Sequence, residues 1–279
     1  MIKVETIESQ LVSFSGKYLG TIVTDAEKVG IAPSGNSLRS LKLYITVSDT
    51  EGATASTGLD AFASIYKIEI LDKAEKIVFE MYGSDIANLG YFTSPIGKKT
   101  LTTFNGTANA MVTNSFAIDI FNDISAVDLN KIVVKLQTLS GFDANSTSTS
   151  VSLTIKGVYD NSGVTTVHVD KKSFSLSGGA NVTILGNTLG EGLSLKALYV
   201  NMLGDTNFSS VSLISNSIHY YDDIIPAELI EDEFVRTYSG HQTGWFVLLE
   251  SASGLVVNSA TELSFNTTGA ISGYFYRFY

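Results

Sequence analysis

The 279-residue sequence contains no cysteine, three prolines, three histidines and a single tryptophan. The absence of cysteine excludes disulfide frameworks, zinc ribbons, iron–sulfur centres and cysteine nucleophiles. So few prolines argue against a proline-rich linker. No run of about 18 apolar residues occurs, so we expect no transmembrane helix. The segment Met1 to Gln10 lacks the continuous apolar core of a signal peptide.

Charged residues are scarce as well, at 16% of the chain, against about 25% in an average globular domain. The net charge is −10, and neither end carries a cluster of lysine and arginine. Because an acidic surface repels phosphate, we expect no direct binding of nucleic acid. Serine, threonine, asparagine and glycine take the place of the charges, a composition typical of an all-β protein with many turns.

Alternation of apolar and polar residues predicts β-strands along most of the chain. Ile65–Leu71 alternates well, with Lys67 and Glu69 directed outwards, and a hairpin turn at Asp72–Lys76 leads to a second strand at Ile77–Tyr82. Other segments rich in β-forming residues predict four more strands, at Leu41–Val47, Phe116–Phe121, Ile132–Leu136 and Val151–Tyr159.

Helix signals are few and short. Ser84–Gly90 begins with a capping residue and ends at a glycine. Pro226–Val235 has proline near its start, acidic residues in its first turns, and Leu229, Ile230 and Phe234 on one face. We therefore expect an all-β protein with short helices in its loops.

The two halves of the sequence repeat the same order of elements. A hairpin followed by a short helix occurs in each half, and the distance between matched segments falls steadily from 160 residues for the first pair to about 120 for the last. The matched pairs are Ser13–Ser15 with Ser173–Ser175, Ile22–Val23 with Val182–Leu185, Ser40–Tyr44 with Ser194–Tyr199, Ile65–Tyr82 with Val211–Tyr221, Phe116 with Trp245, and Val151–Tyr159 with Ile271–Tyr279.

This repeat predicts a tandem duplication of one β domain, with longer loops in the first copy. We place the boundary in the turn-rich segment Asp160–Gly163, which gives domains of residues 1–160 and 161–279. Each half has room for eight strands, which suits an eight-stranded jelly-roll barrel of two packed sheets. The alternatives are two unrelated β-sheets or one long sandwich.

The sequence contains no recognisable catalytic set. None of the histidines, His168, His219 and His241, pairs with another at metal-ligand spacing. No Gly-x-Ser-x-Gly nucleophile elbow occurs. The sequence therefore predicts no catalytic, cofactor-binding or metal-binding residues, and a protein that is not an enzyme.

An acidic run around the second helix has two interpretations. Oxygen ligands in a β loop could bind calcium, although no twelve-residue calcium loop is present. The simpler interpretation, which we favour, is a solvated helix face with favourable charge at the helix start. The residues are Asp222, Asp223, Glu228, Glu231, Asp232 and Glu233.

Glycine-rich and polar segments predict loops rather than sites. Ser177–Gly179 does not open a helix, so it is a turn and not a phosphate cradle. Gly141–Ser150 and Asp49–Ala63 are expected to be long exposed connectors. Asn-x-Ser/Thr sequences are expected by chance in a chain of this composition, and they occur at Asn105, Asn145, Asn181, Asn207 and Asn266.

Aromatic residues gather at Tyr274–Tyr279, where both faces of the predicted strand are aromatic. One interpretation is a central strand covered on both sides. The other is a strand covered in part by a neighbouring subunit, since tyrosine, phenylalanine and arginine suit interfaces.

Two similar jelly rolls in one chain of this length resemble the double jelly-roll major capsid proteins of tailless icosahedral DNA viruses, and the length is most similar to that of bacterial and archaeal members. The resemblance rests on the repeated Ser-Phe-Ser, Ser-Leu-Lys and strand–strand–helix units over the whole chain. It implies a homotrimer of near-hexagonal outline, because three chains with two barrels each give six similar units in a ring of heterologous contacts.

The resemblance also implies partners: neighbouring capsomers, penton and minor capsid proteins and, in members that enclose one, an internal membrane beneath the shell. Because Met1–Gln10 carries no basic cluster, we expect no strong lipid or genome anchor there. The implied location is the virion, after synthesis in the host cytoplasm.

Fold does not fix function, so other classes stay open. Some glycan-cleaving amidases use paired jelly rolls, but they need a groove lined by acids or tryptophan, and Trp245 is the single tryptophan. A carbohydrate-binding or cell-surface adhesion β-sandwich protein, or a phage receptor-binding protein, is the stronger alternative.

Overall fold

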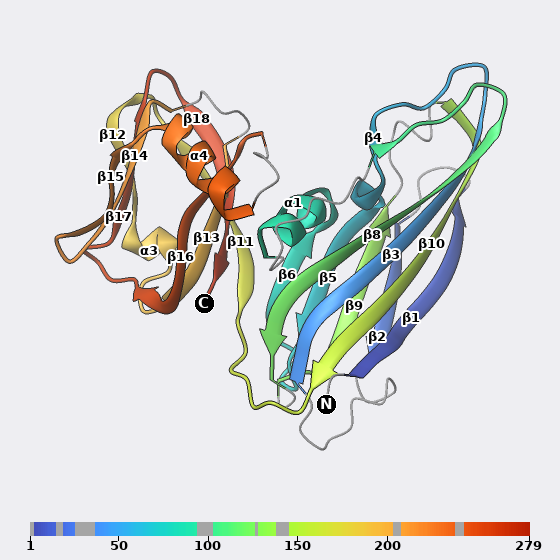
Figure 1. The fold of residues 1–279 in the computed structure, drawn as a ribbon, viewed down its shortest axis with the longest axis horizontal. Helices are drawn as coiled ribbons and strands as arrows, with labels where there is room; N and C mark the ends of the chain where they lie inside the picture. Colours follow the sequence, from blue (N-terminus) through green and yellow to red (C-terminus); the bar gives the residue numbers. More distant parts are fainter. Residues whose placement is uncertain are drawn as a thin grey trace. The chain divides into compact units, whose positions relative to one another are not determined.

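The computed structural model describes residues 3–14, 19–25, 37–93, 103–125, 128–137, 145–202, 208–237 and 243–279. The chain forms two compact units, Met1–Val167 and His168–Tyr279. Figure 1 shows strands throughout both units, with only short helices between them.

Within the N-terminal unit the long strands pair antiparallel in two rows, one in the order β1-β10-β3-β8 and the other in the order β6-β5-β9-β2. The short strands β4 and β7 pair separately, and helix α1 packs against β8, β5 and the 3-10 turn η1. The elements are β1 (Lys3–Phe14), β2 (Leu19–Asp25), β3 (Ser37–Glu51), β4 (Leu59–Asp60), η1 (Ala61–Ser64), β5 (Ile65–Leu71), β6 (Ile77–Tyr82), α1 (Gly83–Thr93), β7 (Thr103–Phe104), β8 (Met111–Ile124), β9 (Lys131–Gln137) and β10 (Ser146–Asp160).

Within the C-terminal unit the strands also pair antiparallel in two rows, in the orders β16-β13-β18-β11 and β12-β17-β14-β15. Helix α4 packs against β16. The elements are β11 (Val169–Leu176), β12 (Gly179–Leu185), α3 (Gly186–Leu189), β13 (Ser194–Asn201), β14 (Ser210–Ser215), β15 (Ile218–Ile224), α4 (Pro226–Thr237), β16 (Trp245–Val256), β17 (Glu262–Thr267) and β18 (Ile271–Phe278).

The two units have the same topology. When the eight long strands of each unit are numbered along the chain, the first, eighth, third and sixth form one sheet and the fifth, fourth, seventh and second form the other. This is the strand order of a jelly roll, and in each unit a helix follows the fifth long strand. The prediction of an all-β chain with two tandem eight-stranded jelly rolls is confirmed. The described residues of the six matched segment pairs, apart from the final Tyr279, fall on equivalent strands.

The core of the C-terminal unit lies between its two sheets. Alternate residues of each strand point inwards, so Leu198 and Val200 of β13 meet Phe246 of β16 and Phe275 of β18 in one buried cluster. Phe174 stacks against both Phe265 and Phe275 in the same cluster. This apolar core fixes the register of the surrounding strands, because a one-residue slip would turn its side chains towards solvent.

The structure shortens both predicted connectors. Ser146–Ser150 belongs to β10, and residues 141–144 of the predicted loop lie outside the described residues. Within Asp49–Ala63, β3 continues to Glu51, and β4 and the start of η1 occupy the far end. The residues at these strand ends are polar, and the sequence pattern therefore did not predict them as strands. Asp49 accepts hydrogen bonds from Ser146 and Thr149, so the two strands continue to pair beyond the apolar core.

The boundary between the compact units falls after Val167, seven residues beyond the boundary placed at 160/161. The intervening segment is held to the N-terminal unit by hydrogen bonds. The Val167 amide donates to the Asp123 carbonyl, and the Ser125 amide donates to the Thr166 hydroxyl. Turn-forming residues mark the end of β10, but these contacts keep the following residues with the first unit.

Candidate functional site

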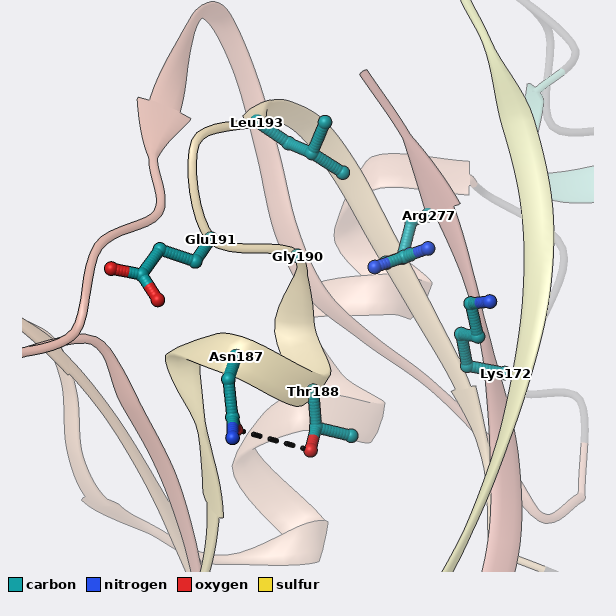
Figure 2. A pocket seen from close by; sticks show the side chains of 7 residues that line it. All are labelled: Lys172, Asn187, Thr188, Gly190, Glu191, Leu193 and Arg277. Carbon is teal, nitrogen blue, oxygen red and sulfur yellow. Dashed lines mark hydrogen bonds between the residues drawn. The ribbon is translucent and has the colours of Figure 1, made fainter.

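An open pocket of about 610 Å³ lies in the C-terminal unit beside α3. Figure 2 shows Lys172 and Arg277 on one side of it and Glu191 on the other. The lining residues come from β11, β18, α3 and the turn after α3: Lys172, Asn187, Thr188, Gly190, Glu191, Leu193 and Arg277.

Arg277 forms one wall of this pocket and is almost fully buried. Its Nε donates to Asp170 Oδ1 over 2.7 Å, and its Nη2 donates to the second oxygen of the same carboxylate. Its Nη1 donates to the Leu189 carbonyl over 3.0 Å, which ties β18 to the end of α3. A bidentate pair of this kind fixes the plane of the guanidinium.

Backbone geometry also shapes the pocket. Gly190 adopts a left-handed conformation with φ +107°, and a Cβ there would lie 2.6 Å from Arg277 Nη1. Only glycine therefore lets the turn pass this close to the guanidinium. The pocket is lined by charged, polar and apolar groups, and its lining holds no histidine and no paired nucleophile and base.

Sequence reasoning did not single out this pocket. Arg277 was seen only as part of the aromatic segment, and Lys172 and Glu191 carried no motif. A charged residue in an otherwise aromatic strand is the one signal that pointed here, because a buried arginine requires a partner.

The structure separates the acidic residues that were considered for calcium. Glu228 Oε2 accepts the Ile225 amide, as expected at a helix start. Asp223 accepts hydrogen bonds from Ser210 and Asn266. Among the described residues, no three acidic or histidine side chains are grouped so that they could hold a metal ion. Asp222 and Glu231 are exposed, and the side chains of Asp232 and Glu233 lie outside the described set.

The histidines occupy unrelated positions. His168 stacks on Tyr279 with ring centroids 5.3 Å apart, at the end of β18. His219 Nδ1 lies 3.2 Å from Asp222 Oδ1, with both side chains at least half exposed. His241 lies outside the described residues.

Two of the asparagines in sequons have structural roles. Asn105 accepts the Gly58 amide, and Asn266 donates to Ser210 and Asp223. Asn145 accepts the Gly52 amide through its backbone carbonyl. The side chain of Asn181 and all of Asn207 lie outside the described set.

The aromatic segment at the end of the sequence forms β18, which lies between β13 and β11 in its sheet. Phe275 points into the core, and Tyr276, on the opposite face, is also completely buried. Trp245 packs edge to face on Tyr274, and the Lys171 ammonium lies 3.5 Å from the Tyr274 ring centroid. The structure therefore agrees with the interpretation of a central strand buried on both faces.

A network of charges lies on the β6-β5-β9 part of the N-terminal unit. Lys67 Nζ lies 2.6 Å from Glu69 and 2.8 Å from Glu80, and Lys135 lies 3.0 Å from Glu69. Burial alone would raise the pKa of Glu69, but hydrogen bonds from the two lysines lower it. Burial likewise opposes the charge of Lys67, but its two carboxylate partners raise the pKa of its ammonium group. Lys67 and Glu69, predicted to face outwards, therefore form a nearly buried ion-pair network.

Large apolar side chains are exposed at few places in the described part of the chain, and three of them lie within eight residues of one another. Ile218 is 58% exposed, Tyr220 43% and Ile225 45%. Ile218 and Tyr220 lie in the first half of the edge strand β15, and Ile225 follows its last residue. This strip has no counterpart on β6, the equivalent strand of the N-terminal unit, where only Ile77 is exposed.

Comparison of sequences finds no known family profile and no curated protein that matches the chain. Comparison of structures, by contrast, finds clear matches over its whole length. The crystal structure of the major capsid protein of STIV, the Sulfolobus Turreted Icosahedral Virus, aligns with a TM-score of 0.72 at 13% identity, covering 100% of this chain and 96% of that one.

Two further solved structures show the same likeness. The major capsid protein P2 of bacteriophage PM2 aligns with a TM-score of 0.60 at 11% identity, over 100% of this chain and 98% of that one. A chain of the PBCV-1 virus capsid aligns with a TM-score of 0.59 at 8% identity, over 100% and 94%. At these identities the likeness is one of fold, and the fold of this chain is the double jelly roll that these viral capsid chains have.

Proposed function

We propose that this chain is the major capsid protein of a tailless icosahedral virus, a structural protein without enzymatic activity. One observation carries the proposal: both jelly rolls, and not one alone, align with a capsid protein of nearly the same length, over 100% of this chain and 96% of the other. A protein that shared only a common barrel would match half of such a chain.

In this role three copies form a trimer of near-hexagonal outline. Each copy contributes two barrels of the same topology, so the trimer presents six similar units and can tile a hexagonal lattice. Contacts in such a ring are heterologous. The trimers meet neighbouring capsomers, penton proteins and minor capsid proteins in the virion, after synthesis in the host cytoplasm.

The chain is proposed to belong to the shell itself and not to hold the genome. Its net charge of −10 opposes phosphate binding. No helix in the described ranges is both long and apolar enough to span a bilayer. As the resemblance implies, any internal membrane would lie beneath the shell.

The alternative of a carbohydrate-binding or adhesion protein has less support. Such a protein recognises sugars with exposed aromatic platforms, yet Trp245 is only 3% exposed and Tyr276 is completely buried. No observation favours this function over the capsid function.

The test is the mass and shape of the purified protein, measured by light scattering and negative-stain microscopy. Trimers of near-hexagonal outline, or sheets of such units, are expected. A strict monomer at high concentration that binds glycans would overturn the proposal.

A further inference from the structure

The pocket beside α3 lies where the apolar core of the C-terminal unit ends. Alternate residues of a strand share one face, and Phe174 of β11 and Phe275 of β18 belong to the buried core cluster. One step further along the same faces, β11 carries Lys172 and β18 carries Arg277, and both line the pocket. The stripe of core residues on these two strands therefore changes from aromatic rings to cationic groups at the pocket.

The Arg277 guanidinium has donors that no described residue uses. Its Nε and Nη2 donate to Asp170, and its Nη1 donates to the Leu189 carbonyl. Nη1 and Nη2 each carry a second N–H, and no acceptor for either lies among the described residues. The side chain is only 7% exposed, and buried polar groups in proteins nearly always have a hydrogen-bond partner. These N–H groups therefore indicate an acceptor oxygen that enters through the pocket.

Two further charges of the lining are unpaired. Neither Lys172 nor Glu191 forms an ion pair with any residue in the described ranges. Figure 2 shows Lys172 on the same side of the pocket as Arg277, and the Glu191 carboxylate directed away from Arg277. Because Asp170 balances the charge of Arg277, Lys172 leaves this side of the pocket with a single excess positive charge. The opposite side carries the negative charge of Glu191.

We infer that this pocket binds a small molecule with a carboxylate at one end and a positive charge at the other, as in an amino acid. The carboxylate accepts hydrogen bonds from Arg277 and pairs with Lys172, and such charge-assisted bonds are the strong ones. The positively charged end lies on the side of Glu191. The volume of about 610 Å³ is within the range of small-molecule sites.

The charges of the pocket select this class of ligand. A carboxylate carries one negative charge and matches the single excess positive charge beside Arg277. A dianion would exceed that charge, and a molecule with a carboxylate at each end would place its second carboxylate near Glu191, where like charges repel. The inference does not depend on the capsid function, because every lining residue belongs to the C-terminal unit.

The first experiment compares three ligands of equal chain length that differ only at the far end. These are ε-aminocaproate, caproate and adipate, titrated into the purified full chain by isothermal titration calorimetry at low ionic strength. We expect ε-aminocaproate to bind most tightly and caproate more weakly. Adipate should bind at least about tenfold more weakly than ε-aminocaproate, because its second carboxylate approaches Glu191.

The second experiment repeats the titrations with variants of the lining. Lys172→Gln should weaken the binding of ε-aminocaproate at least about tenfold, because a charge-assisted contact is lost. Glu191→Gln should remove the difference between the three ligands. Lys171→Gln is the matched control and should bind as the wild type does, because Lys171 lies on the other face of β11, over the ring of Tyr274. Circular dichroism checks that each variant is folded.

Two results would overturn the inference as a whole. One is a wild-type chain that binds none of the three ligands at millimolar concentration, and the other is binding that Lys172→Gln leaves unchanged, which would place the ligand elsewhere. Equal affinities of the wild type for all three ligands, or the same order of affinities in Glu191→Gln, would refute the selection of a positively charged end. None of these results bears on trimer formation, so the capsid function is tested separately.

Discussion

The buried pair of Asp170 and Arg277 provides a quantitative test of how the C-terminal unit is held together. The two residues are cross-strand partners on β11 and β18. The Arg277 side chain is 7% exposed and that of Asp170 is 26% exposed. Replacing Asp170 by valine leaves the guanidinium buried, with only the Leu189 carbonyl as its acceptor.

The magnitude follows from the burial of each partner. Breaking a fully buried pair costs about 3–5 kcal/mol. Because water reaches part of Asp170, we expect Asp170→Val to cost about 2–3 kcal/mol. Arg277→Met leaves a carboxylate that can hydrate, and should cost about 1–2 kcal/mol. The double variant removes both charges and loses mainly the bond to Leu189, so its cost should be about 1 kcal/mol.

The assay is urea unfolding followed by the fluorescence of Trp245. This is the only tryptophan and lies on β16 in the same unit, so its signal reports on the C-terminal unit. Protein concentration is held constant, because association would add stability. The control is a cycle on Lys42 and Asp119, a cross-strand pair with side chains 31% and 37% exposed, followed by circular dichroism. Its coupling should stay below about 1 kcal/mol.

A double-mutant cycle decides whether the pair acts as a unit. If the double variant is as unstable as the sum of the two single variants, Arg277 does not depend on Asp170, and the reasoning from burial is wrong. A destabilisation below about 1 kcal/mol for Asp170→Val alone would lead to the same conclusion, since leaving a buried charge unpaired destabilises a protein by more than that.

Four further predictions concern the N-terminal unit and the β14–β15 turn. The Glu51 carboxylate is 3% exposed and its Oε1 has no hydrogen-bond partner. Because Glu51→Gln removes this buried charge, it should raise the melting temperature at neutral pH, and a lower melting temperature would contradict the prediction. Gly106→Ala should destabilise by about 1–3 kcal/mol in urea unfolding, because its Cβ would lie 1.9 Å from Glu51 Oε1; unchanged stability would show that the carboxylate moves freely. Lys67 helps to lower the pKa of Glu69 below its ordinary 4.5, so the stability that Glu69 contributes is present above that pH and lost as pH falls through the lowered value. Curves of unfolding free energy against pH for the wild type and Glu69→Gln should therefore converge in acid, and parallel curves would refute this. Ser217 has φ +62° in the turn, so Ser217→Gly should stabilise by about 0.4–1 kcal/mol in thermal melts, and a loss would contradict it.

Strand positions could be predicted wherever apolar residues carried the pattern. Ile65–Leu71 and Ile77–Tyr82 coincide with β5 and β6 in the structure. The turn between them forms as expected, with the Asp72 amide donating to the Lys76 carbonyl. Alternation with burial on one face is a strong signal, because the side chains that alternate are those that the core requires.

Strand ends lined by hydroxyl groups could not be predicted in the same way. β3 and β8 continue beyond the predicted segments. Ser115 of β8, outside the predicted strand, pairs with Thr46, and Ser48 and Thr113, both outside, pair with each other, each over 2.8 Å. Such residues are also typical of loops, so their pairing depends on a partner strand that is distant in the sequence. β17 was missed for a related reason, since Glu262–Thr267 is short and mostly polar on one face.

The pocket and the exposed strip were beyond sequence reasoning because each depends on tertiary placement. Arg277 is 107 residues from Asp170 and 88 from Leu189, and no local pattern links them. The exposure of β15 is equally hidden, since Ile218, Tyr220 and Tyr221 read as ordinary strand residues until the sheet shows which of them face the core.

The duplicated units have kept their topology while their surfaces have diverged. On the sheet of β3, β8 and β10, the face opposite the core carries hydroxyl pairs and the Lys42–Asp119 ion pair. On the equivalent sheet of the C-terminal unit, the same face carries the buried rings of Tyr199, Trp245 and Tyr276. Strand order is constrained by the core, which both copies need, whereas the outer faces are free to specialise. Two units with unlike outer faces cannot substitute for one another in an assembly.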